Sequence, residues 1–190
     1  MKYLNYLCNI FTYFFIFLHL NLKNVKCRSN FEIIYTKFNC TKIDPQSYLD
    51  FINCNISKNS QRSSLNIEMK FKKDLNRFRV NILIAVPRGS SDFVILNLKN
   101  VNGCQIIGNQ NQGPFLTQVL NLVNQYGNII RKCPYKRDTL YYLRAFRLDM
   151  SALPPLSFET DMKCIFELVR EGHKIFWGCA ETRIQMRHKH

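Results

Sequence analysis

The sequence predicts a mostly β protein, an antiparallel β-sandwich with one short helix in a flap bounded by two cysteines. Apolar and polar residues alternate in three consecutive segments. Turn residues separate these segments about every 10 to 12 positions, which is typical of a sandwich or barrel. A single amphipathic helical pattern lies between Cys104 and Cys133. Together these observations favour two packed sheets and one helical flap.

The alternation is clearest in the middle of the chain. Leu65–Phe71 and Phe78–Val86 both alternate apolar with mostly polar residues, and the short segment Lys73–Asn76 lies between them. Two half-buried strands joined by a short polar loop predict an antiparallel hairpin. A third strand, Phe93–Leu98, is expected after a turn at Pro87–Ser91.

More strands are expected nearer the two ends of the chain. They are Phe31–Phe38, Thr139–Leu148 and a C-terminal hairpin of Phe158–Val169 and Lys174–Met186. A turn centred between Glu171 and Gly172 places Cys164 opposite Cys179, within disulfide reach. A one-residue bulge at Gly172 would break this register.

The flap helix is expected to begin at Pro114 and to end before Gly127, because proline suits the first helical position and glycine the residue just past the end. Leu122 alone falls outside its apolar stripe, which consists of Phe115, Leu116, Val119, Leu120, Val123 and Tyr126. A helix this short does not persist alone in water, so the stripe must pack on another part of the protein. If Cys104 and Cys133 pair, the helix becomes a lid tied at both ends. Closing that loop contributes roughly 3–4 kcal/mol in chain-entropy models.

The first 27 residues resemble a secretory signal peptide. A basic start at Lys2 precedes the nearly continuous apolar run Tyr3–Leu22, and cleavage is expected after Cys27. An uncleaved membrane anchor is the alternative, since about 20 apolar residues can span a bilayer. Removing residues 1–27 from the 190-residue chain leaves 163 residues. That length predicts one sandwich domain at 28–186 and a flexible tail at 187–190.

Cysteine and asparagine patterns fit a secreted, extracellular protein. Six cysteines remain after cleavage and predict three disulfides with 15 possible pairings: Cys40, Cys54, Cys104, Cys133, Cys164 and Cys179. Asn39 and Asn55 each begin an Asn-x-Ser/Thr triplet, which predicts N-glycosylation on exposed loops or strand edges.

The charge is strongly basic. Three of the 27 basic residues leave with the signal peptide, so 24 remain against 13 acidic residues, a net charge of +11. Such a surface can steer a protein to anionic lipids, glycans or nucleic acid, although a solvated positive face is the simpler interpretation. The basic residues are scattered, with Lys70, Lys72 and Lys73 the nearest approach to a run. No nucleic-acid module signature is present, and secretion argues against that partner.

No catalytic pattern is present in the sequence. The histidines that survive cleavage are His173 in a turn and His188 and His190 in the tail, so a nucleophile would have no base. The sequence has no nucleophile elbow, no zinc-binding motif and no phosphate loop. We therefore expect no enzymatic activity, no cofactor and no metal.

The order of the motifs resembles a large insect family of small secreted proteins of unknown function that includes the chemosensory CheB proteins. The matching motifs are Lys37–Cys40, Phe51–Cys54, Val101–Ile107, the amphipathic helix, Cys133–Tyr135 and a strand ending at Leu153–Pro154. The resemblance runs from about Phe31 to Thr182. Two positions depart from the family pattern. Asn102 replaces an acidic residue, and Pro154–Phe158 lacks the usual glycine.

That family is similar to the ganglioside-activator and ML-type lipid-recognition domains. The resemblance therefore implies an ML-like, immunoglobulin-like sandwich, with disulfides Cys40–Cys54 and Cys104–Cys133. Cys164 and Cys179 are additional to this four-cysteine frame, which fits a separate pairing in the last hairpin. A chemosensory or pheromone-related setting is also implied.

The function expected from these observations is binding of a lipid or other apolar small molecule in a cavity between the sheets. The expected cavity walls are Leu65, Ile67, Met69, Phe71, Phe78, Val80, Ile82 and Ile84, and the expected lid is Phe115, Leu116, Val119, Leu120 and Val123. A membrane receptor or an anionic lipid surface is a candidate further partner. A secreted protein–protein, co-receptor or immune recognition module that uses the basic surface is the alternative. The third possible function is that of a closed-core structural domain without a ligand.

Overall fold

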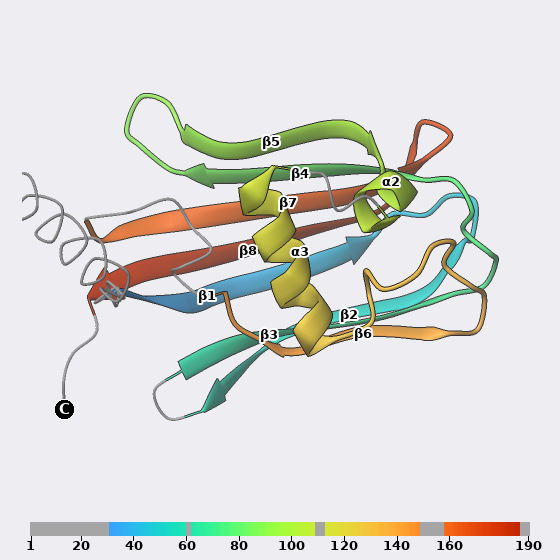
Figure 1. The fold of residues 1–190 in the computed structure, drawn as a ribbon, viewed down its shortest axis with the longest axis horizontal. Helices are drawn as coiled ribbons and strands as arrows, with labels where there is room; N and C mark the ends of the chain where they lie inside the picture. Colours follow the sequence, from blue (N-terminus) through green and yellow to red (C-terminus); the bar gives the residue numbers. More distant parts are fainter. Residues whose placement is uncertain (1–30, 60–61, 109–112, 149–157, 187–190) are drawn as a thin grey trace, which may run out of the picture.

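The computed structural model describes residues 31–59, 62–108, 113–148 and 158–186 (Figure 1). The expected signal peptide, the Leu153–Pro154 motif of the family resemblance and the C-terminal tail lie outside these ranges. The elements are β1 (Phe31–Lys42), β2 (Leu49–Asn59), β3 (Arg62–Phe71), β4 (Arg79–Val86), β5 (Phe93–Asn102), α2 (Gly103–Gly108), α3 (Pro114–Tyr126), β6 (Leu140–Phe146), β7 (Thr160–Arg170) and β8 (His173–Met186). Within these ranges, no helix is both long enough and apolar enough to cross a membrane.

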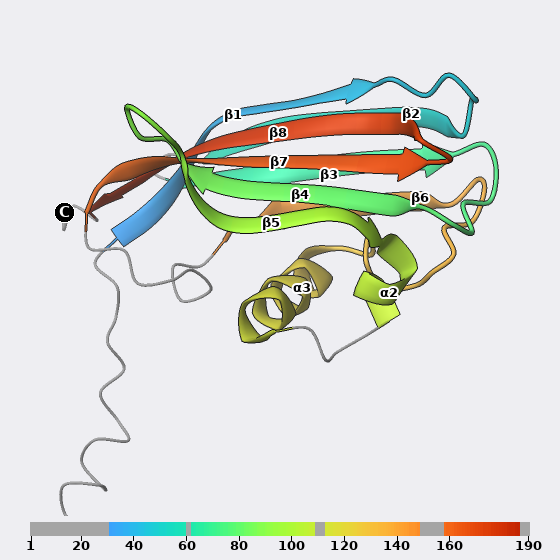
Figure 2. The same ribbon diagram turned by 90° about the horizontal axis from the view of Figure 1, so that it is seen from above.

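Two antiparallel sheets make up the body of the protein. One sheet has the strand order β1-β8-β7-β4-β5, and the other has the order β2-β3-β6. The sheets lie face to face, and both helices lie on the side where β5 and β6 are the outermost strands (Figure 2). This architecture confirms the predicted mostly β antiparallel sandwich with a helical flap, to which the structure adds the short helix α2.

The prediction that Leu65–Phe71 and Phe78–Val86 form a hairpin is wrong. β3 pairs with β2 and β6, whereas β4 pairs with β5 and β7, so the two strands belong to different sheets. Leu75, in their connection, is fully buried and exchanges backbone hydrogen bonds with Tyr135 at 2.8 and 3.3 Å. The connection therefore crosses between the sheets. Alternation indicates which face of a strand is buried, but it does not name the neighbouring strand.

The C-terminal hairpin is confirmed, but its register is not. The strands pair as expected at Arg170–His173 and Val169–Lys174, but the next pair is Leu168 with Phe176, so Ile175 is an extra residue in β8. The carbonyl oxygen of Ile175 accepts hydrogen bonds from two backbone amides of the loop after β1, both at 3.0 Å. These contacts hold the extra residue in place.

This bulge overturns the expected third disulfide. Cys164 lies opposite Ala180 and Cys179 lies opposite Ile165, so the two cysteines project from opposite faces of the sheet. Both are free thiols in the structure. The two disulfides implied by the family resemblance are confirmed. Cys40–Cys54 joins β1 to β2 with the Cα atoms 5.7 Å apart, and Cys104–Cys133 joins α2 to the loop before β6 with the Cα atoms 5.4 Å apart.

Three clusters of buried side chains fill the interior. The first contains Leu49, Met69, Phe71, Leu75, Phe78, Tyr135, Tyr141, Leu168, Ile175 and Phe176, the second Tyr35, Phe38, Leu65, Leu143, Phe146 and Ala180, and the third Ile84, Met162 and Ile184. In the first cluster the Tyr135 ring stacks on both Phe71 and Phe78, with centroids 5.3 and 5.1 Å away. The first cluster lies toward the end of the sandwich that carries α2.

Candidate ligand-binding site

Helix α3 lies across one side of the sandwich and packs on β6 (Figures 1 and 2). Its proline start and the glycine after its last residue are confirmed. The three side chains that pack against the second cluster are Leu122, Val123 and Tyr126. The Tyr126 ring meets Phe146 edge-on, with centroids 5.6 Å apart. α3 is thus attached to the sandwich mainly through its C-terminal half.

The face of α3 that packs on the sandwich matches the predicted stripe only in part. Leu122, which the stripe leaves out, packs on the second cluster. Leu116, Val119 and Leu120 are only half-buried, and the side chain of Phe115 lies outside the described part of the structure. No described side chain of α3 is fully buried. The helix therefore covers the sandwich without becoming part of its core.

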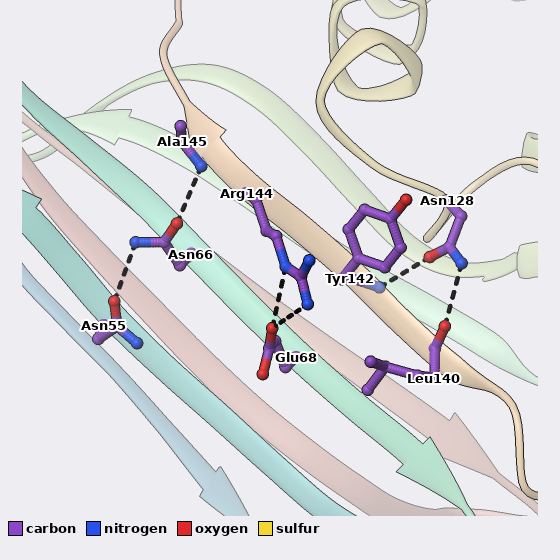
Figure 3. A network of polar contacts seen from close by, with 8 residues as sticks. All are labelled: Asn55, Asn66, Glu68, Asn128, Leu140, Tyr142, Arg144 and Ala145. Atoms are coloured by element: carbon purple, nitrogen blue, oxygen red, sulfur yellow. Dashed lines mark hydrogen bonds and ion pairs between the residues drawn. The ribbon is translucent and has the colours of Figure 1, made fainter.

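The C-terminal end of α3 is fixed to the edge of β6 (Figure 3). Asn128 donates its backbone N–H to the Tyr142 carbonyl (3.0 Å) and its side-chain amide to the Leu140 carbonyl (3.0 Å). Its side-chain oxygen accepts the Tyr142 backbone N–H at 2.7 Å. Gly127 lies so close to β6 that a Cβ atom there would overlap the Tyr142 carbonyl oxygen. Glycine is required at this contact.

The predicted wall residues come from both sheets. Leu65 and Ile67 belong to the second cluster or pack on it, Met69, Phe71 and Phe78 belong to the first, and Ile84 belongs to the third with Ile82 packed against it. Val80 is half-buried. These side chains fill the space between the sheets in this structure, so their role as the walls of a ligand cavity stays a prediction.

A pocket of about 470 Å³ lies at the end of the flap, and none of the predicted wall residues lines it. Its lining residues are Cys104, Ile107, Gly108, Arg131, Lys132, Cys133 and Pro134. The Cys104–Cys133 disulfide and Ile107 also pack on the first cluster. Sequence reasoning missed this pocket. The available hint was the pair of basic residues directly before Cys133.

The basic run noted in the sequence is largely neutralised. Lys70 pairs with Asp138 at 3.3 Å and Lys72 with Asp50 at 3.8 Å. Lys73 donates to the Gln46 carbonyl at 3.1 Å and lies over the Tyr48 ring. The run therefore does not form a free positive patch. Within the described ranges, no group of three or more histidine, cysteine or acidic residues could hold a metal ion.

Both predicted glycosylation sites are exposed. The side-chain oxygen of Asn55 accepts a hydrogen bond from Asn66 at 2.9 Å, and Asn66 in turn accepts the backbone N–H of Ala145 at 2.9 Å (Figure 3). This contact uses the amide oxygen of Asn55 and not the nitrogen that a glycan modifies. Glycosylation of Asn39 and Asn55 stays a prediction.

The fold and the flap define the class: a disulfide-bonded antiparallel β-sandwich with a helix tied across one side. A family model described as "Protein of unknown function (DUF1091)" matches residues 78–164, which is less than half of the chain. A search of curated proteins finds no match. Among solved structures, the chain is similar to a Niemann-Pick type C2 protein from the Japanese carpenter ant. The identity is 13%, 80% of this chain and 90% of that chain are covered, and the TM-score is 0.29.

Proposed function

We propose that this protein binds a lipid or other apolar small molecule between its two sheets, beneath α3, without catalysing a reaction. The observation that carries this proposal is the packing of α3. The helix crosses one side of the sandwich with its described apolar side chains only half-buried, while its C-terminal end is fixed to β6. A helix of a closed core would bury that stripe fully. A ligand placed beneath α3 would remove the remaining apolar surface from water, which is favourable.

The second cluster would supply the ligand contacts nearest to α3. Phe38, Leu65, Leu143 and Phe146 lie there beneath Leu122 and Tyr126. Ligand entry would move these α3 side chains outward and leave the first cluster in place. Of the predicted walls, Leu65 and Ile67 would then meet the ligand first.

The setting we propose is extracellular. The two disulfides support it, because such bonds persist in oxidising compartments. The family resemblance supports secretion and a chemosensory or pheromone-related role, with a membrane receptor or an anionic lipid surface as a further partner.

Native mass spectrometry of the secreted protein, followed by organic extraction and lipid analysis, tests the proposal. A near-stoichiometric apolar molecule should co-purify with the wild type. Leu120→Asp should lose it, because the substitution places a charge on the apolar side of α3. Gln118→Asp is the matched control, since it adds the same charge at an exposed position of the same helix.

Two results would contradict binding beneath α3. One is a protein that carries no ligand and takes up no fluorescent fatty-acid probe. The other is retention of ligand by Leu120→Asp with loss in a triple Lys70→Gln, Lys72→Gln, Lys73→Gln variant. The second result would favour a protein-interaction module that uses the basic surface.

A further inference from the structure

The pocket at the end of the flap combines an apolar floor with a basic rim. The floor consists of the Cys104–Cys133 disulfide, Ile107 and Pro134, and the rim carries the exposed side chains of Arg131 and Lys132. Its volume of about 470 Å³ falls within the range usual for small-molecule sites. A site of this composition suits a molecule with one charged end and one apolar end.

The rim has a positive charge that no acidic side chain neutralises within the described residues. Among the residues that the structure describes, neither Arg131 nor Lys132 has a carboxylate within ion-pair distance. Asp74 belongs to a neighbouring loop, but it accepts hydrogen bonds from the Arg137 backbone and the Lys136 side chain. These two bonds hold the pKa of Asp74 below its ordinary value. Its negative charge is therefore already engaged away from the pocket.

The pocket adjoins both the interior and the lid. The disulfide and Ile107 pack directly on the first cluster, so the floor of the pocket rests on the core between the sheets. Arg131 donates from its guanidinium to the Asn124 carbonyl of α3 at 3.3 Å. An apolar chain whose charged end lay beside Arg131 and Lys132 would pass Ile107 and Ile129 and reach the space beneath α3, because Ile129 packs on both the first and the second cluster.

We propose that this pocket holds the head group of a single-chain amphiphile whose head is anionic, a carboxylate or a phosphate. The inference rests on the proposed function. It adds the charge of the ligand's head group and the end of the sandwich at which that head group lies. Arg131 and Lys132 bind the head group by charge-assisted hydrogen bonds. Ile107 and the disulfide contact the first carbons of the chain.

The test compares ligands that share a 12-carbon chain and differ in the head group. Binding of dodecanoate, dodecyl phosphate and dodecanol is measured by native mass spectrometry and by displacement of a fluorescent fatty acid from the full secreted protein. The two anionic ligands should bind the wild type about tenfold more tightly than dodecanol does. Raising the salt concentration should narrow that difference, because ions screen an exposed site.

A variant carrying Arg131→Gln and Lys132→Gln isolates the head-group contact. Its affinity for both anionic ligands should fall about tenfold, and its affinity for dodecanol should stay the same. Lys58→Gln with Arg62→Gln is the matched control, since it removes two exposed positive charges at the turn between β2 and β3. The control should bind all three ligands as the wild type does. Equal urea midpoints would show that each variant remains folded.

Five outcomes would overturn the inference. One is an unchanged affinity for the anionic ligands in the Arg131/Lys132 variant. Another is an equal loss of affinity in the control variant, which would show that the overall charge of the protein, and not the pocket, determines binding. Acetate and inorganic phosphate that compete as well as the amphiphiles would show a free-anion site instead. Dodecanol binding as tightly as dodecanoate would remove the head-group site and leave the proposed function standing. If none of the three ligands binds, both proposals fail.

Discussion

Gly127 sets the closest approach between the end of α3 and strand β6. A Cβ atom at this position would overlap the Tyr142 carbonyl oxygen, so Gly127→Ala must push the helix end away and weaken the hydrogen bonds of Asn128. We expect a loss of about 1–3 kcal/mol in the free energy of unfolding, measured by urea denaturation. Gly89→Ala is the control, because no atom lies within 4 Å of a Cβ built there. Equal losses in the two variants would contradict the close contact.

Tyr35 and Tyr135 link the stability of the protein to alkaline pH. Burial raises the pKa of both phenols well above the ordinary value near 10, and the Tyr135 hydroxyl donates to the Ile129 carbonyl at 2.7 Å. Since the folded pKa is the higher one, their contribution to stability is complete below about pH 10. It is lost as the pH rises from there toward the folded pKa.

Tyr135→Phe should therefore make the pH dependence shallower. Above pH 10, the free energy of unfolding of the wild type should fall more steeply with pH than that of the variant, which has one fewer ionisable phenol. Urea denaturation at a series of pH values measures both slopes. Parallel slopes would show that Tyr135 ionises as easily in the folded protein as in the unfolded chain.

At the scale of elements, the C-terminal half of α3 packs on the second cluster, whereas its N-terminal half only covers the sandwich. Both Leu120 and Leu122 are half-buried, but Leu122 packs on the second cluster, whereas Leu120 packs on none of the three clusters. Leu122→Ala should lower the free energy of unfolding by about 1–2 kcal/mol, and Leu120→Ala by less, because fewer packing contacts are lost. Urea midpoints of the two single variants compare them directly. A larger loss of unfolding free energy for Leu120→Ala would contradict this expectation. It would indicate that α3 packs on the sandwich through the stripe predicted from the sequence.

The strands show which features of the fold can be predicted from a sequence pattern and which cannot. Alternation at Leu65–Phe71 and Phe78–Val86 predicted two strands and their buried faces, because burial imposes a period of two on the side chains. It could not show that the connection through Leu75 crosses to the other sheet. The register of β8 depends on contacts that Ile175 makes with the loop after β1, more than 130 positions earlier in the chain. Local patterns do not contain this information.

At the scale of the whole molecule, the disulfide set can be read directly. Non-reducing peptide mapping of alkylated protein should link Cys40 to Cys54 and Cys104 to Cys133, and it should find Cys164 and Cys179 as alkylated thiols. A linked Cys164–Cys179 peptide would contradict the observed register. Mapping after reduction is the control that all six peptides are recovered.

The candidate site was predictable only in part. The cysteine frame and the helix were visible in the sequence, since both leave local patterns. The pocket was not, because it forms where α2 and the loop before β6 come together, and the sequence did not predict α2. Nor could the sequence show that Lys70 and Lys72 form ion pairs, whereas Arg131 and Lys132 form none with the acidic residues of the described ranges.

The Cys40–Cys54 disulfide has a consequence for how the sandwich can move. β1 and β2 belong to different sheets and are covalently joined on the side opposite to α3 (Figure 2). The sheets cannot separate at this disulfide without breaking a covalent bond. Any opening of the sandwich is therefore a hinge rotation about the edge formed by β1 and β2. The Cys104–Cys133 bond restrains the β5 and β6 edge at the end that carries α2, so the separation is widest at the other end of these two strands. A bulky ligand would push the sheets apart there, and a pair of distance labels, one near Phe93 on β5 and one near Phe146 on β6, would measure how far.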